Sequence, residues 1–227
     1  MFKGWHRWAL RKKIAAQAVQ HTLLIFSCDG LAPIGQPRLR SHTALKRCHH
    51  LPTFRAVVEL STNRLQLRPF LATDVTPAYL AFLQDPIVTR FSNQRFRKHT
   101  LASCQAYQRS FKANDNSFLL IEHRQDSAAI GTMTIYRTPQ HGTADIGLML
   151  GNRHYWQKGL GLEAWLAVLE HLLQEQGIRK VTGGTARPNI GMVRIMEESG
   201  MTLEAVRQRH ELIEGVAVDL LYYARFS

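Results

Sequence analysis

One stretch, Asp145 to Ala164, constrains the fold of this chain more than any other. It reads DIGLMLGNRHYWQKGLGLEA. Its first part, residues 146–150, is apolar with a single glycine, which predicts a buried strand. Gly159 and Gly161 then stand just before a long amphipathic pattern, so a helix is expected to begin there. This order predicts a phosphate site, because the first N–H groups of a helix lack internal partners and carry the positive end of its dipole. Both glycines lack Cβ atoms and are expected to let the phosphate approach the backbone closely.

Two classes of nucleotide-binding loop fail on the details of this stretch. The dinucleotide fingerprint G-x-G-x-x-A is formally present at Gly159, Gly161 and Ala164, but it needs a strand directly before its first glycine and an acid about twenty residues further on. Residues 152–158 intervene here, and no acid stands at residues 180–183. The phosphate loop of nucleotide hydrolases continues as Gly-Lys-Ser/Thr, whereas this loop continues as Gly-Leu-Glu.

The same residues resemble the acetyl-CoA loop of the GNAT acetyltransferases. The resemblance is carried by WQKGLGLEA at residues 156–164, preceded by DIG at 145–147. In the branch that includes ribosomal-protein N-terminal acetyltransferases and amino-sugar acetyltransferases, W-G-K-G-Y-A-T-E-A is usual. Two further segments match in the family's order, TNRLQLRP at residues 62–69 and the stretch from Asn189 to Met201.

This resemblance implies an α+β GNAT fold. Such a fold has a central mixed, mostly antiparallel sheet of seven strands, in which strands four and five splay apart, with helices on both faces. Hydrophobic periodicity and turn residues predict elements in the same order. The expected elements are a strand at 64–69, helices at 75–84 and 101–112, strands at 117–122, 128–136 and 143–150, a long helix ending at Gly177, a strand at 180–185, a helix at 189–199 and a hairpin at 205–213 and 216–225.

Positive charge is concentrated at the N-terminus. The net charge is +12, and residues 1–57 hold ten Lys or Arg and one acid, which leaves 19 bases and 16 acids for the rest. We therefore predict a basic N-terminal extension at 1–57, disordered or loosely helical, and a GNAT domain at 58–227 that has no nucleic-acid partner. For the extension, a secretion signal, an organelle presequence and a true translation start near Val57 or Val58 stay open.

Cysteine spacing and hydropathy limit the partners further. Cys28, Cys48 and Cys104 show no C-x-x-C spacing, so neither a disulfide framework nor a metal site is expected. No apolar run approaches the eighteen or so residues that span a bilayer, so no membrane partner is expected. The sequence favours a cytoplasmic location, where acetyl-CoA is made, and leaves a monomer or a homodimer open.

The resemblance assigns acetyl-CoA as co-substrate and implies which residues hold it. Backbone groups of Leu148, Met149 and Leu150 would bind the pantetheine arm between the splayed strands, and Asn189 would contact the arm from the other side. The loop around the helix start would hold the pyrophosphate through its amides, with residues Gln157, Lys158, Gly159, Leu160, Gly161 and Leu162.

Acetyl transfer to an amine needs a neutral nucleophile, a stabilised oxyanion and a thiolate that can leave. A backbone N–H near Leu148 or Met149 is the oxyanion donor that the resemblance implies. Asp145 occupies the Glu position of the family's E-I-G segment and is our first candidate for the general base, with Glu122 as the second.

The group that protonates the leaving thiolate is less defined by the sequence. Many family members place a Tyr four residues before the Gly that ends the last helix, and this chain has Met196 there. A thiol of pKa about 8.5 needs only modest help to leave as the thiolate. The residues that could assist are Tyr155, His210, Tyr222 and Tyr223.

A basic, polar segment between the first two predicted helices is suited to an anionic acceptor. It contains Arg90, Asn93, Gln94, Arg95, Arg97 and His99. The predicted function is transfer of an acetyl group from acetyl-CoA to a primary amine of a small, anionic acceptor such as a nucleotide-linked amino sugar. The alternatives are acetylation of a protein's N-terminal α-amine and a non-catalytic CoA-binding module.

Overall fold

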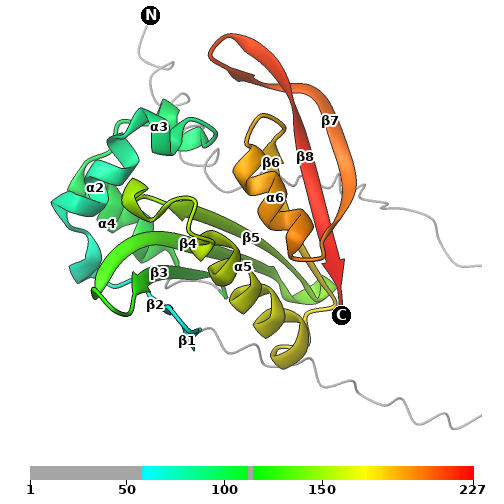
Figure 1. The fold of residues 1–227 in the computed structure, drawn as a ribbon, viewed down its shortest axis with the longest axis horizontal. Coiled ribbons are helices and arrows are strands. Elements are labelled where there is room, and N and C mark those ends of the chain that lie inside the picture. Colours follow the sequence, from blue (N-terminus) through cyan, green and yellow to red (C-terminus); the bar gives the residue numbers. More distant parts are fainter. Residues whose placement is uncertain (1–57, 112–114) are drawn as a thin grey trace, which may run out of the picture. The chain divides into compact units, whose positions relative to one another are not determined.

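The structure is a computed structural model that describes residues 58–111 and 115–227, all within one compact unit, residues 49–227 (Figure 1). The extension predicted at 1–57 lies outside the described residues. The strands are β1 (Leu60–Ser61), β2 (Leu65–Pro69), β3 (Ser117–His123), β4 (Ala128–Thr138), β5 (Thr143–Leu150), β6 (Lys180–Ala186), β7 (Thr202–Ile213) and β8 (Val216–Phe226). The α-helices are α2 (Pro77–Gln84), α3 (Pro86–Thr89), α4 (Leu101–Ser110), α5 (Leu160–Glu170) and α6 (Ile190–Glu198).

The strands form one sheet in the order β1-β2-β3-β4-β5-β6-β8-β7. Every neighbouring pair is antiparallel except β5 and β6, which are parallel. The predicted class, a mixed and mostly antiparallel sheet, is therefore confirmed. The predicted count of seven strands was wrong, because Leu60 and Ser61 add a short edge strand opposite Leu67 and Gln66. Two residues are too few to show an alternating pattern.

β5 and β6 lie side by side only at one end. They pair at Thr143 with Lys180, Ala144 with Val181 and Asp145 with Thr182, and no pairing follows in the described chain. β6 instead pairs with β8 along its whole length, from Lys180 to Ala186. The predicted splay of the fourth and fifth strands is confirmed, and it leaves the edge of β5 from residue 146 onward unpaired on that side.

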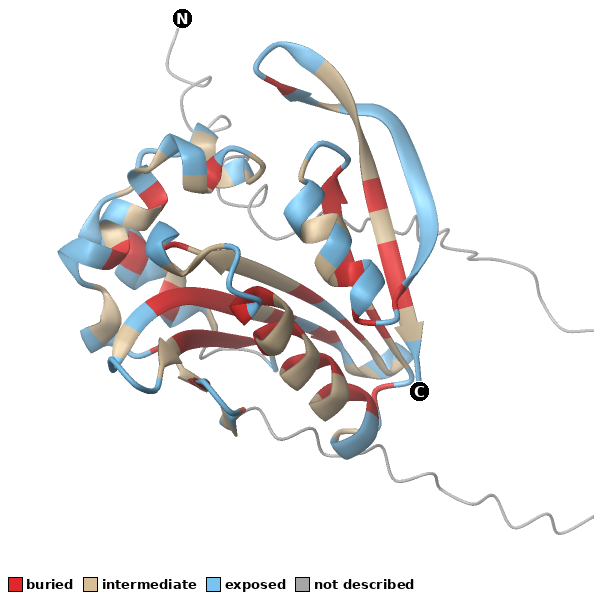
Figure 2. Cartoon of the chain, in the orientation of Figure 1, coloured by how far each residue is buried: buried red, intermediate tan, exposed pale blue. Residues whose placement is uncertain are grey.

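The sheet carries a separate hydrophobic core on each face (Figure 2). Alternate residues of β3 point to opposite faces. Leu119 and Ile121 join the larger core under α5 and α6, where Trp165 is fully buried. Phe118 and Leu120 join the smaller core against α2 and α4. The prediction of helices on both faces is confirmed.

Local capping explains where the helices begin. Thr76 caps α2 by accepting a hydrogen bond from the amide of Tyr79. Asp85 ends that helix, as predicted, but its carboxylate then accepts from the amide of Ile87 and starts α3. The basic, polar segment between the two predicted helices is therefore partly helical, with α3 and a 3-10 turn, η2 (Asn93–Phe96).

The long helix and the final hairpin end and turn at the residues predicted for them. α5 continues as one π-helical segment, η6 (His171–Glu175), and the chain leaves it through Gly177, whose φ is 65°. β7 and β8 are joined by Glu214 and Gly215, whose φ angles of 52° and 83° fit a hairpin turn with two left-handed residues. No helix in the described part of the chain is long and apolar enough to cross a membrane.

Candidate active site

The unpaired edge of β5 exposes particular backbone groups to the gap beside β6. The N–H and C=O of one residue point to the same side of a strand, and the side alternates along the chain. The Ile146 carbonyl lies 3.4 Å from the position a Cβ would take on Gly183 of β6. The Met149 carbonyl lies against Gly131 of β4. Leu148 therefore presents its N–H and C=O to the gap, whereas those of Met149 face β4.

Leu150 follows Leu148 on the same edge, but its carbonyl is already engaged. The indole nitrogen of Trp156 donates to it at 2.8 Å and ties the glycine loop to the end of β5. Of the three residues predicted to offer backbone groups, Leu148 is thus the one whose amide and carbonyl both lie at the gap.

The glycine loop turns into α5 through left-handed backbone. Gln157 and Gly159 have φ angles of 59° and 75°, and Gly159 is the N-cap of the helix. Glycine offers no capping side chain, so the N–H groups of the first turn are left for a ligand. Gly159 is exposed. This geometry fits a diphosphate, since the helix dipole and these amides favour an anion at the same point.

Gly161 serves a packing purpose that was not expected. It is buried, and a Cβ there would meet Ile195 Cδ1 at 3.0 Å, Leu150 Cδ1 at 3.4 Å and Leu148 Cδ2 at 3.5 Å. Its missing side chain lets α5 pack closely on α6 and β5. That Gly161 also lets a phosphate approach the backbone closely stays a prediction.

An ion pair that sequence reasoning missed holds the loop from outside. Glu163, in the first turn of α5, accepts hydrogen bonds from the Thr62 hydroxyl at 2.6 Å and the Arg64 amide at 2.9 Å, and pairs with the Arg64 guanidinium at 2.6 Å. Arg64 Nη1 also donates to the Lys158 carbonyl at 2.9 Å. Burial acts against the Glu163 carboxylate, but these bonds prevail and lower its pKa. The sequence signal for this contact was Thr62 and Arg64, which lie within the TNRLQLRP segment that resembles the family.

Asp145 stands at the closed end of the gap, at the last paired position of β5. It is exposed and lies on the sheet face opposite to the buried Ile146. Its Oδ2 accepts a hydrogen bond from the Thr182 hydroxyl of β6 at 2.8 Å. Thr182 is a second residue that the sequence did not single out. Along the strand, Asp145 and Leu148 are roughly 10 Å apart.

Glu122, the second candidate base, lies elsewhere. Arg68 bridges it to Asp74, with 2.8 Å to each carboxylate. On β4, Glu122 opposes Ala129 while Asp145 opposes Tyr136, so roughly 23 Å of strand separates them. The structure does not bring the two carboxylates together.

The four candidate assisting groups occupy four different environments. The Tyr155 hydroxyl donates to Asp126 at 2.5 Å beside the β3–β4 turn, which raises the tyrosine pKa, and His210 lies on the exposed edge strand β7. The Tyr223 hydroxyl donates to Glu197 of α6 at 2.9 Å. Tyr222 opposes Gly184 of β6, two positions from Thr182 on the same face as Asp145.

Asn189 lies on the far side of the gap. Met196, at the position where many family members have a tyrosine, is part of the hydrophobic core. Asn189 precedes α6, and its side-chain nitrogen donates to the Thr185 hydroxyl of β6 at 3.0 Å. Met196 is buried in the larger core, with 1% of its surface exposed. A side chain there packs against neighbours and offers no proton.

Comparison with known proteins identifies the family. The sequence profile of the acetyltransferase (GNAT) domain matches residues 64–202. The chain belongs to the GNAT acetyltransferase family. The family and enzyme class predicted from the sequence, an N-acetyltransferase that uses acetyl-CoA, are confirmed. Among curated GNAT proteins, the chain is 26% identical over 115 residues to the probable N-acetyltransferase YjcK of Bacillus subtilis, an alignment that covers 50% of this chain and 63% of that relative.

Solved GNAT structures share the fold at low identity. A GNAT acetyltransferase from Bacillus anthracis has a TM-score of 0.65 at 20% identity, covering 74% of this chain and 98% of its own. RimL, a ribosomal L7/L12 α-N-protein acetyltransferase in complex with CoA, has a TM-score of 0.65 at 16% identity, with 75% and 97% covered. The microcin C7 self-immunity acetyltransferase MccE, in complex with acetyl-CoA and AMP, has a TM-score of 0.63 at 19% identity. That match covers 73% of this chain and 94% of MccE.

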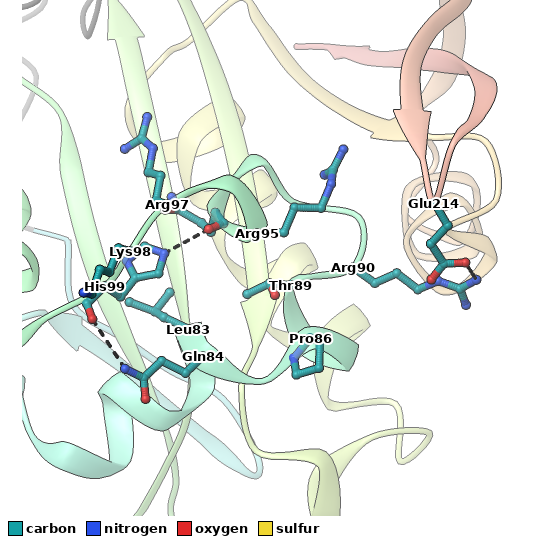
Figure 3. A pocket seen from close by; sticks show the side chains of 11 residues that line it. Leu83, Gln84, Pro86, Thr89, Arg90, Arg95, Arg97, Lys98, His99 and Glu214 are labelled. Carbon is teal, nitrogen blue, oxygen red and sulfur yellow. Dashed lines mark hydrogen bonds and ion pairs between the residues drawn. The ribbon is translucent and has the colours of Figure 1, made fainter.

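A basic cavity of about 460 Å³ lies between the α2–α4 connection and the tip of the β7–β8 hairpin of this GNAT domain (Figure 3). We call it the arginine cavity. It takes in the predicted basic segment except Asn93, and Glu214 lines it from the hairpin. Its lining residues are Leu83, Gln84, Pro86, Thr89, Arg90, Gln94, Arg95, Arg97, Lys98, His99 and Glu214.

Proposed function

We propose that this GNAT protein transfers the acetyl group of acetyl-CoA to the primary amine of a small, anionic acceptor. The observation that carries the proposal is the unpaired edge of β5 beyond Asp145, which leads to a helix start capped only by glycine. An extended arm with amide groups can bond to such an edge as an additional strand does. A diphosphate at the end of that arm can then lie on the first turn of α5.

The residues around the gap divide the chemistry between them. The amine attacks the acetyl carbon, so a C–N bond forms and the C–S bond breaks. The Leu148 N–H donates to the acetyl oxygen as negative charge develops on it. Asp145 accepts the proton that the nitrogen loses, which a short chain of waters relays along the strand. The sulfur leaves as thiolate and takes its proton from solvent or from Tyr222, the candidate that shares a sheet face with Asp145.

The acceptor is assigned from the arginine cavity. Its cations come from the segment between α2 and α4, the two helices that pack on the sheet face that carries Asp145. A small amine that also bears a negative charge would be attracted to this wall while its nitrogen reaches the gap. A nucleotide-linked amino sugar is one compound of this class. The RimL likeness keeps the N-terminal amine of a protein as the second candidate.

The proposal is tested by following thiol release from acetyl-CoA with the full chain and a panel of amines. The panel contains an amino sugar, a nucleotide-linked amino sugar, a polyamine and an N-terminal peptide. Saturable release that is fastest with the anionic small amine supports the proposal. Fastest release with the peptide favours the protein acceptor. Calorimetry that detects CoA binding without turnover of any amine points to the non-catalytic alternative, and no CoA binding at all overturns the assignment.

A further inference from the structure

We propose that the arginine cavity is a phosphate-binding site and that Arg95 anchors the phosphate. The inference rests on the proposed function and narrows its acceptor to a phosphate ester or diphosphate that bears a primary amine. The following observations carry it.

The charge of the lining exceeds what a single carboxylate ligand would need. Four lining residues are permanent cations, Arg90, Arg95, Arg97 and Lys98, and one is an acid, Glu214. With His99 neutral, the net charge is +3. A phosphate group carries close to two negative charges near pH 7 and three acceptor oxygens, so it can use several of these donors at once. Guanidinium forks match such oxygens in pairs.

Among the described lining cations, Arg95 has a buried side-chain donor without a partner. Its Nη2 donates to the Leu212 carbonyl of β7 at 3.1 Å and lies 3.9 Å from the Glu211 carboxylate. Its Nη1 is buried and has no hydrogen-bond partner within the described residues. Only 17% of its side chain is exposed, and its guanidinium lies 4.2 Å from the centre of the Phe96 ring. A buried donor without an acceptor is costly, and a ligand oxygen would satisfy it once the Arg95 guanidinium turns toward the cavity.

The two walls of the cavity belong to the two halves of the splayed sheet. Leu83 packs in the smaller core together with Met149 of β5. Glu214 stands at the tip of the hairpin whose strand β8 pairs with β6. Arg90 reaches across to Glu214 at 2.8 Å, as Figure 3 shows. A phosphate between these walls would link the half that holds Leu148 to the half that holds Thr182.

Inorganic phosphate is the probe, titrated by calorimetry into the full chain already saturated with CoA, so that the glycine loop is occupied. We expect phosphate to bind and Arg95→Met to weaken it roughly 10- to 100-fold, because a charge-assisted hydrogen bond is lost. Arg109→Met is the matched control, since Arg109 is exposed on α4 outside the cavity lining. It should leave phosphate affinity unchanged.

A second variant guards against a folding artefact in Arg95→Met. Glu214→Gln removes the only acid of the lining and releases Arg90, so phosphate should bind about two- to fivefold more tightly. Damage to the fold would not strengthen binding. No phosphate binding by the CoA-saturated chain, or equal affinity in Arg95→Met and Arg109→Met, overturns the inference.

The outcomes separate this inference from the proposed function. Turnover of uncharged or cationic amines by a chain that binds no phosphate leaves acetyl transfer standing and removes the phosphate site. Absence of CoA binding removes acetyl transfer. The comparison of Arg95→Met with Arg109→Met then still tests the cavity, because both variants keep the same glycine loop.

Discussion

The guanidinium of Arg64 lies 2.6 Å from the carboxylate of Glu163, across the start of α5. Arg64 precedes β2, and Glu163 follows Gly159 by one helical turn. The same guanidinium holds the Lys158 carbonyl just before the glycine. An acid in the first turn interacts with the positive end of the helix dipole, where the coenzyme's diphosphate is expected to lie. Arg64 therefore neutralises a charge that would repel the coenzyme and also fixes the loop.

We expect Arg64→Met to weaken CoA binding roughly tenfold while kcat changes little. The loss of one charge-assisted contact and the exposure of the Glu163 charge account for that magnitude. Calorimetry with CoA measures the affinity, and steady-state kinetics separate KM from kcat. The surface variant Arg109→Met should behave as wild type, and wild-type affinity in Arg64→Met would refute the role.

The double variant Arg64→Met/Glu163→Gln separates charge from positioning. If repulsion by the stranded carboxylate dominates, the second substitution restores part of the affinity lost in the first. Should the double variant bind CoA no better than Arg64→Met, holding of the Lys158 carbonyl is the main effect. If repulsion dominates, high salt should also reduce the difference in CoA affinity between wild type and Arg64→Met. If holding of the Lys158 carbonyl dominates, salt should leave that difference unchanged.

The two glycines of the loop should respond differently to alanine. At Gly159 the φ of 75° is left-handed, which costs an alanine about 1 to 2 kcal/mol. Gly161 has helical backbone, where alanine gains up to about 1 kcal/mol of helix propensity but presses on Ile195 at 3.0 Å. Urea unfolding should show Gly159→Ala clearly destabilised and Gly161→Ala within about 1 kcal/mol of wild type. An equal loss in both variants would contradict this account.

Local patterns predicted the elements of the fold. The apolar run ending at Leu150, the glycine pair and the Leu-rich stripe of α5 are visible within a short window. Glu214-Gly215 likewise marked the hairpin, because only a few residue types adopt its left-handed turn readily. The two residues of β1 escaped detection because so short a strand has no period.

Contacts between distant residues could not be predicted in the same way. Arg64 and Glu163 are 99 positions apart, and Thr182 is 37 positions from Asp145. Nothing in the periodicity of either segment specifies such a partner, because the contact exists only once the sheet is assembled. Gly161 illustrates the same limit. Its packing role depends on Ile195 of α6, which is distant in the sequence. From the sequence alone, Gly161 could therefore not be distinguished from Gly159.

Asp145 and its partner Thr182 give a graded test of the general base. Asp145→Asn keeps the shape and removes the proton acceptor, so kcat should fall roughly 100-fold or more, with CoA affinity unchanged. Thr182→Val removes the hydroxyl that donates to Asp145 Oδ2 but keeps the carboxylate, so a smaller, severalfold loss is expected, and Thr182→Ser should restore the rate. An unchanged kcat in Asp145→Asn would show that Asp145 is not the general base.

The Arg68 cluster predicts how stability depends on pH. Burial raises the pKa of Asp74, but hydrogen bonds from Arg68 and the Leu71 amide outweigh it and bring the pKa below its ordinary value of 3.8. A carboxylate with a depressed folded-state pKa contributes stability that is fully present above the unfolded-state pKa. That contribution is lost as the pH falls through the folded-state pKa. Asp74→Asn should therefore be less stable than wild type by about 1 to 2 kcal/mol at pH 7.

The difference between Asp74→Asn and wild type should shrink as the pH falls from 5 to 3, because Asp74 has the higher pKa in the unfolded chain, which therefore binds the proton first and is stabilised relative to the native state. Urea unfolding at several pH values measures both curves. Glu198→Gln, at an exposed site on α6, should run parallel to wild type throughout. A gap between wild type and Asp74→Asn that stays constant down to pH 3 would mean that Asp74 stabilises through shape alone and that its ionised form contributes nothing.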